Sequence, residues 1–141
     1  MLPDEVWARH SNPKSGWTRL LAYPALIYAV YARSWRLLGA TLAFLAVNPF
    51  VFPEPKTEPD DWMYRVVRAE QRWSEAGRPF VGVGFPQVIN LIQVPVFAYN
   101  VYSAVRRRPV RTIVSTAATM ALKLWFVDEL VKRDDSTRES N

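Results

Sequence analysis

Residues 79–105, PFVGVGFPQVINLIQVPVFAYNVYSAV, decide the fold because none of these 27 residues is charged. A helix needs roughly 20 mostly apolar residues to cross a bilayer, and this run is longer. Shorter charge-free runs cover residues 20–32, 37–53 and 112–122. If flanking Trp and Arg side chains lie at the membrane surface, these runs predict four spanning helices at about 17–34, 36–53, 79–105 and 109–131.

The composition excludes several classes of site. The chain has 141 residues, no Cys and one His, with 50% hydrophobic residues, 22% charged residues and a net charge of +5. The absence of Cys excludes disulfide scaffolds, thiolate metal sites and thiol catalysis, and a single His excludes zinc sites built from several imidazoles. We therefore expect no metal and no cofactor. The length fits a single domain covering 1–141, and a soluble four-helix bundle of very apolar helices is the alternative to a membrane protein.

Aromatic and basic residues predict how the spans are oriented. Tyr and Trp side chains gather near both ends of the expected spans, as they do where helices meet the two surfaces of a bilayer. Six of the 18 Lys and Arg residues lie in the two tight loops around 33–36 and 106–111, and the other 12 lie on the opposite side of the expected spans or in the segment ends that face it. Because orientation follows the number of basic residues, we expect both termini in the cytoplasm. The density of arginines at 106–108 instead favours the tight loops as the cytoplasmic side.

The segment between the second and third spans predicts an amphipathic helix at about 60–77. One stripe at helical spacing is apolar, and Arg65, Arg68 and Arg72 form another; the apolar stripe is Trp62, Val66, Ala69 and Trp73. Such a helix is typical of one lying in the membrane interface. The alternative is a helix packed on the ends of the bundle with its arginines in solvent. The expected fold is thus all-α: an integral membrane four-helix bundle of two helical hairpins with an amphipathic interfacial helix between them.

Polar residues in the third and fourth spans fall on single helical faces. In the third span, an arc of about 140° holds the amides of Gln87, Asn90, Gln93 and Asn100. In the fourth span, one face holds Thr112, Thr116, Thr119 and Lys123. Amides and hydroxyls in hydrocarbon need partners, so both faces are expected to turn inward. They predict either a polar lining for a solute or hydrogen bonds that only hold the helices together.

Lys123 is the most informative single residue in the expected spans. Twelve residues of helix separate it from Arg111, which places it about 18 Å from that interface. An ionisable group at this depth is a candidate for function. The alternative is that its side chain extends to the far interface, where Asp128 follows.

Three segments resemble a known family. The N-terminus contains WARHSNPKSGWTR at 7–19, the second span ends VNPFVFPEP at 47–55, and the fourth contains KLWFVD at 123–128. In this order they resemble an uncharacterised family of small membrane proteins, common in haloarchaea and known only as a domain of unknown function. The resemblance implies a four-helix membrane protein and no particular activity, cofactor or catalytic residue.

The same segments must meet at one membrane face, which predicts a polar cluster. Its candidate members are Arg9, His10, Asn12, Arg19, Asn48, Lys123 and Asp128. Such donors suit an anionic group, for example a lipid phosphate or carboxylate. The alternative is that Asn12 and Asn48 cap or end helices and that the charges pair locally.

Three functions follow as hypotheses. The preferred one is a non-enzymatic binding or assembly partner in the membrane, as a homo-oligomer or within a membrane complex. The second is a solute or ion pathway lined by the polar faces of spans three and four. The third is a lipid-headgroup enzyme with His10 as general base. The expected partner is the bilayer, including anionic lipid, and not nucleic acid, because the basic run at 106–111 lies in a tight interhelical loop.

Overall fold

The computed structural model describes residues 3–58 and 60–141. This part contains no strand and six helices: α1 (Asp4–His10), α2 (Pro13–Ala32), α3 (Trp35–Val51), α4 (Trp62–Glu75), α5 (Gln87–Val105) and α6 (Pro109–Glu139). The all-α prediction is therefore confirmed for the described residues.

Local capping explains where several helices begin. The side chain of Asn12 accepts a hydrogen bond from the Lys14 backbone N–H at 3.0 Å, and Pro13 follows as the first helical residue of α2. Asp61 caps α4 in the same way through the Met63 N–H at 2.8 Å. These caps satisfy N–H groups that have no partner within the helix, so the starts are specified by neighbouring residues.

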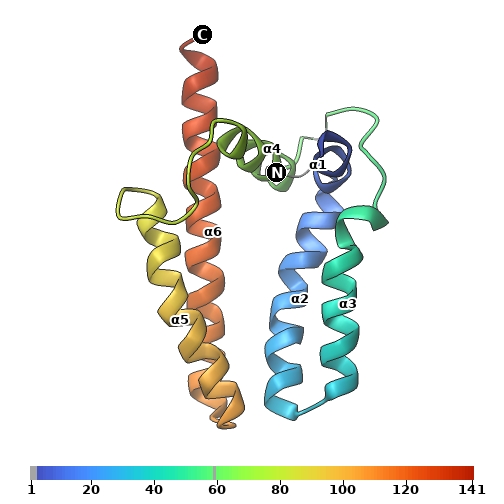
Figure 1. Cartoon of the computed structure of the whole chain (residues 1–141), viewed down its shortest axis with the longest axis vertical. Coiled ribbons are helices and arrows are strands. Elements are labelled where there is room, and N and C mark those ends of the chain that lie inside the picture. The colour runs from blue at the N-terminus through green and yellow to red at the C-terminus, as the bar shows by residue number, and fades with distance from the viewer. Residues whose placement is uncertain (1–2, 59) are drawn as a thin grey trace.

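Two helical hairpins form the body of the molecule, α2 with α3 and α5 with α6 (Figure 1). Their turns lie at the same end and are tied together by arginines. Arg33 donates to the Val105 carbonyl at 2.9 Å, and Arg107 donates to the Tyr31 carbonyl at 3.0 Å. Each turn therefore donates hydrogen bonds to carbonyls at the end of the first helix of the other hairpin. These bonds hold the two turns side by side.

The four long helices form an open row instead of the closed four-helix bundle expected from the sequence. Helix α2 contacts α3 on one side and both α5 and α6 on the other. Within the described residues, α3 contacts only α1 and α2. The bundle prediction is corrected accordingly: the hairpins meet only through α2, and most of the circumference of α3 is left free.

Helix α4 lies across the end of the row that is opposite the hairpin turns (Figure 1). Its apolar stripe, including Val66, Ala69 and Trp73, packs with Phe126 and Leu130 of α6 in the main hydrophobic core. Two arginines of the row remain partly exposed and form ion pairs with α6: Arg65 pairs with Asp135 at 3.4 Å, and Arg72 pairs with Asp134. The packing of α4 on α6 agrees with the alternative of a packed helix, whereas the ion pairs of Arg65 and Arg72 differ from the solvated arginines of that alternative. The location of α4 at a membrane interface stays a prediction.

Two helix boundaries differ most from the expected spans, and α2 also begins earlier than expected, at Pro13. Residues 79–86 are not helical, and α5 begins at Gln87, after Pro86, so the charge-free run is only partly helix. Gly82, Gly84 and Pro86 explain this, since glycine and proline disfavour a helix interior. At the other end of the chain, α6 continues to Glu139, well beyond 131, and its charged last part provides Asp134 and Asp135 to α4.

Two of the helices, α5 and α6, are long and apolar enough to cross a membrane by length and composition. Helix α3 is also apolar, but at 17 residues it is shorter than these two helices. Only 22% of the apolar window in α5 and 28% of that in α6 are buried within the molecule. The core helix of a soluble protein would be mostly buried, so these helices instead present apolar side chains outward.

Candidate functional site

Arg9 and Asn12 hold the N-terminal segment to the end of α3. The Arg9 guanidinium donates to the Phe50 carbonyl at 3.2 Å, and the Asn12 amide donates to the Pro53 carbonyl at 3.1 Å. With its carbonyl oxygen, Asn12 also caps α2. Both side chains are therefore engaged with backbone groups, as the capping alternative for Asn12 expects, and neither faces a cavity.

A chain of hydrogen bonds runs from Arg19 through the buried His10 to α3. The Arg19 guanidinium contacts His10 Nε2, and His10 Nδ1 lies 3.3 Å from Ser15 Oγ. Ser15 donates to Asn48 Oδ1 at 2.6 Å, and the Asn48 amide donates to Thr18 Oγ1 at 3.2 Å. The predicted members His10, Arg19 and Asn48 are thus brought together, with Ser15 as the link that the sequence interpretation missed.

The direction of this chain follows from the protonation of His10. Burial first, and the adjacent charge of Arg19 second, lower the pKa of His10 from 6.5 to about 4. The ring is therefore neutral at pH 7, and because a guanidinium can only donate, Nε2 must be the acceptor and Nδ1–H the donor to Ser15. A neutral His10 with both nitrogens engaged orients Arg19 and is not available as a general base.

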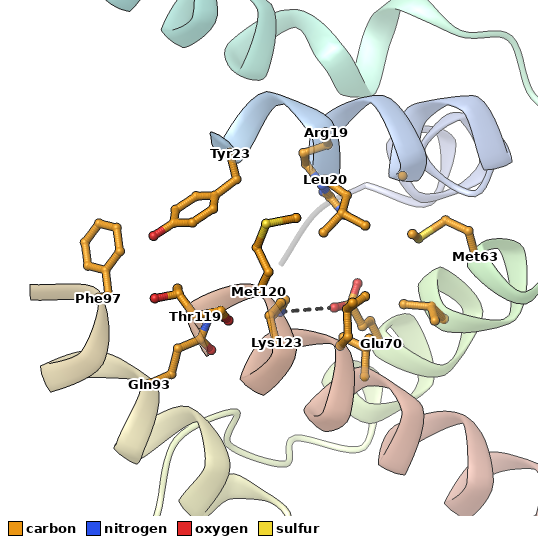
Figure 2. A pocket seen from close by; sticks show the side chains of 14 residues that line it. Arg19, Leu20, Tyr23, Met63, Glu70, Gln93, Phe97, Thr119, Met120 and Lys123 are labelled. Atoms are coloured by element: carbon orange, nitrogen blue, oxygen red, sulfur yellow. Dashed lines mark hydrogen bonds and ion pairs between the residues drawn. The ribbon is translucent and has the colours of Figure 1, made fainter. Parts of the chain in front are cut away.

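Arg19 is one of the residues around a cavity of about 340 Å³ between α2, α4, α5 and α6. Its wall is mainly apolar and its polar residues lie in two groups (Figure 2). One group is charged: Arg19 of α2, Glu70 of α4 and Lys123 of α6. We call this space the α4 cavity. The other lining residues are Gly16, Leu20, Tyr23, Met63, Val66, Gln93, Phe97, Thr119, Met120, Leu124 and Val127.

The charged group of the α4 cavity has an ion pair at its centre. Lys123 Nζ lies 3.6 Å from Glu70 Oε1, drawn as a dashed line in Figure 2. The Glu70 side chain is 13% exposed, whereas that of Lys123 is 45% exposed. Lys123 therefore pairs with a carboxylate on α4, a partner that neither interpretation of Lys123 named.

The polar group of the cavity connects α2 to the seam between α5 and α6. The Tyr23 hydroxyl donates to Asn100 Oδ1 at 2.5 Å, and the fully buried Asn100 amide reaches Ser115 Oγ and Thr116 Oγ1, each at 2.9 Å. Gln93 also donates to the Thr119 carbonyl, at 3.4 Å. The polar faces of the two helices thus bond to each other across the seam.

Only some of the predicted lining residues face a cavity. Gln93 and Thr119 line the α4 cavity, and Thr116 lines a second cavity between α2 and α6. Asn100 is enclosed in the seam, while Asn90 donates to the Phe80 carbonyl at 2.9 Å. Gln87 lies in the first turn of α5. Asp128, from the predicted anion cluster, accepts from the Trp62 indole at 3.2 Å and pairs with Lys132 at 2.9 Å.

Glu70 is the most important residue of the cavity that sequence interpretation missed. A signal was present, because Glu70 follows Met63 and Val66 at helical spacings of seven and four on the apolar side of its helix. A carboxylate on such a stripe needs a cation in the facing element. Tyr23 gave a weaker signal, since a single Tyr inside a span is also typical of an interface residue.

Comparison with known proteins gives one match. A family model described as "Family of unknown function (DUF6653)" matches residues 1–141. No curated protein and no solved structure matches the chain. The predicted resemblance is confirmed as far as a family of unknown function, while its membrane nature and its distribution among haloarchaea stay predictions. Within the described residues, no group of three His, Asp or Glu side chains is placed to hold a metal ion.

Proposed function

Because the chain belongs to this family of unknown function over its whole length, we propose its role from its own geometry: it is a multi-pass membrane protein that binds, without converting, a ligand in the α4 cavity. The observation that carries the binding role is the cavity itself, which has an apolar wall and an oriented charged group. Its volume of about 340 Å³ is within the range of small-molecule sites.

The distribution of polarity supports the membrane part of the proposal. Large apolar side chains are exposed along the helices, for example Leu42 of α3, Ile92 of α5 and Ile113 of α6, which are 51%, 50% and 69% exposed. The interior also contains polar side chains, with Asn48 and Asn100 fully buried. Soluble proteins rarely expose so much contiguous apolar surface, whereas helices in lipid associate through buried polar and small residues.

The proposed topology has the hairpin turns on one side of the membrane. The charged helix α4, both termini and the charged last part of α6 lie on the other, cytoplasmic side, where 12 of the 18 basic residues gather. At 31 residues α6 is about 46 Å long, which exceeds the roughly 30 Å hydrocarbon core and leaves its last turns in water beside α4.

The state of the polar groups favours binding over catalysis. Lys123 is paired with Glu70, the Tyr23 hydroxyl donates to Asn100, and the Thr119 hydroxyl donates to the Ser115 carbonyl at 2.8 Å. A headgroup enzyme needs a free acid–base group beside a nucleophile, and these contacts leave neither. The solute pathway along α5 and α6 is disfavoured for the same reason, since their polar faces are used in the seam.

Topology is testable because the chain contains no Cys. Single-cysteine variants Ser34→Cys and Arg106→Cys mark the two hairpin turns, and Thr57→Cys and Ser140→Cys mark the opposite side. In intact cells, a membrane-impermeant maleimide should label the first pair and leave the second pair unlabelled until the cells are lysed. Labelling of all four sites in intact cells, or purification of the chain without detergent as a soluble protein, would contradict the membrane proposal.

Ligand binding is tested by filling the α4 cavity. Leu20 lines the cavity, whereas its neighbour Leu21 is 69% exposed, so Leu20→Trp and Leu21→Trp form a matched pair. Native mass spectrometry from a mild detergent should show a bound small molecule on the wild type and on Leu21→Trp, and a much lower occupancy on Leu20→Trp. Equal occupancy in the three proteins would place the ligand elsewhere, and an empty wild type would contradict the binding role.

The assembly part of the expected function concerns α3. Its Gly39 and Ala43 are exposed four residues apart, and a Cβ added at Gly39 would meet no atom within 4 Å. Small residues at this spacing allow two helices to approach closely in a bilayer. We therefore propose that α3, which among the described residues contacts only α1 and α2, supports self-association.

A further inference from the structure

A second cavity adjoins the α4 cavity on the side of the hairpin turns. It has a volume of about 500 Å³ and lies between α2 and α6, with Ile27, Tyr31 and Ile113 among its lining residues. Met120 lines both cavities, so its side chain stands at their boundary. We call this second space the hairpin cavity. Unlike the α4 cavity, it has no charged residue in its lining.

Together the two cavities follow one side of α2 from Arg19 to Tyr31. Twelve residues of helix correspond to about 18 Å. One leaflet of the roughly 30 Å hydrocarbon core is about 15 Å deep, which is the depth that one acyl chain occupies. The combined groove therefore has the length of a single lipid chain, with charged residues at only one end.

The charges at that end select the head group. Arg19 and Lys123 contribute two positive charges and Glu70 one negative charge, so the α4 cavity carries one net positive charge. A ligand with one negative charge neutralises the site, whereas a neutral head group leaves it charged in a mainly apolar wall. The Arg19 guanidinium is already oriented by His10, which lowers the cost of binding an anion there.

On the basis of the proposed binding function, we infer that the ligand is a singly negative, single-chain lipid whose head group pairs with Arg19 and Lys123 and whose chain passes Met120 into the hairpin cavity. The chemistry shared by its sources is a monoanion, either the carboxylate of a fatty acid or the phosphodiester of a lysophospholipid. Glu70 pairs with Lys123, so the head group competes with Glu70 for it.

The test uses the full, delipidated chain in a non-ionic detergent and three probes with the same acyl chain: palmitate, palmitoyl-lysophosphatidylglycerol and palmitoyl-lysophosphatidylcholine. Titration calorimetry should show one site for at least one of the two anionic probes and an affinity at least tenfold lower for the zwitterionic one. A preference between the two anionic probes assigns the carboxylate or the phosphodiester. Binding of none of the three contradicts the proposed binding function, whereas equal binding of all three leaves that function intact and overturns the inference.

Point variants test where the head group of the ligand binds. A hydrogen bond to a charged group contributes enough that Lys123→Met should weaken binding of the anionic probe by about 10- to 100-fold without changing that of the zwitterionic probe. Glu70→Gln raises the net charge of the site and should strengthen anionic binding several-fold, a gain that misfolding cannot produce. Arg138→Met, which removes a charge from the exposed end of α6, is the control and should change neither. No gain in Glu70→Gln together with no loss in Lys123→Met overturns the head-group assignment.

A substitution at Met120 tests where the acyl chain of the ligand lies. Met120→Trp should block the boundary between the cavities and weaken palmitate binding much more than binding of octanoate, whose chain is half as long. An equal loss for both fatty acids would show that the chain does not enter the hairpin cavity.

Discussion

Replacing Asn100 by Leu tests whether the polar faces of α5 and α6 form a seam or line a pathway. The Asn100 amide donates two hydrogen atoms toward Ser115, Thr116 and the Thr112 carbonyl, and its oxygen accepts from Tyr23. Three hydrogen bonds are thus lost at once in a fully buried position. At about 0.6 kcal/mol for each such bond between membrane helices, Asn100→Leu should lower the free energy of unfolding by about 2 kcal/mol.

The matched control lies on the same helix. In the part of the chain that the structure describes, Asn90 makes one hydrogen bond, to Phe80, and its buried carbonyl oxygen has no partner. Asn90→Leu therefore removes one bond and also removes an unsatisfied group. Its unfolding free energy should change by less than about 1 kcal/mol. Tyr23→Phe should lose a single bond, and the double-mutant cycle with Asn100→Leu should give a coupling energy between about 0.6 and 1.7 kcal/mol.

The assay is reversible unfolding in mixed micelles of dodecylmaltoside and sodium dodecyl sulfate, followed by tryptophan fluorescence. If Asn100→Leu is neutral or more stable than the wild type, and the coupling to Tyr23 is zero, the seam does not hold the helices together. That result would favour the lining alternative, because a side chain that faces a water-filled pathway exchanges its hydrogen bonds with water and loses little on replacement.

Three further predictions concern pH, packing and assembly. The pKa of His10 is lowered to about 4 in the folded protein, so the stability that neutral His10 contributes is complete above its unfolded pKa of 6.5 and is lost as pH falls toward 4. The difference in unfolding free energy between wild type and His10→Gln should shrink over that window. A difference independent of pH would contradict the burial of His10. A Cβ at Gly16 would collide with the Met63 side chain, so Gly16→Ala should lower the free energy of unfolding by about 1–3 kcal/mol in the same assay. Met63→Ala should partly restore it. A neutral Gly16→Ala would show that this contact is not tight. Native mass spectrometry should detect an oligomer of the wild type that Gly39→Leu reduces, and a strict monomer in both would refute the assembly role of α3.

The helices themselves were predictable from the sequence because their signals are local. A charge-free run, a capping residue such as Asn12 and a proline at the first helical position all act within a few residues of the helix that they specify. The late start of α5 was predictable from the same kind of signal, since Gly82, Gly84 and Pro86 interrupt the run at 79–105. The polar faces of α5 and α6 also follow from helical spacing alone.

The composition of the site was only partly predictable. Lys123 was identified because an ionisable group inside a span is unusual, and Arg19 because three segments were expected to meet at one membrane face; both line the α4 cavity. Arg9, Asn12 and Asp128 were grouped with them on the argument that they meet one face, but each is satisfied by a neighbour of its own. Proximity to one end of the row does not imply a shared site, because a short polar side chain bonds to the nearest free carbonyl or carboxylate.

The sequence by itself determined which segments are helical and which side of each helix must find a partner. The tertiary structure alone decided who that partner is: the apolar stripe of α4 packs on α6, Lys123 meets Glu70, and α3 stays apart from the second hairpin. The physical reason is that a helical period sets the direction of each side chain from its own helix axis, whereas the facing element depends on the path of the loops and on how the surfaces fit. Those contacts join residues as far apart in the chain as Glu70 and Lys123, and no local pattern encodes them.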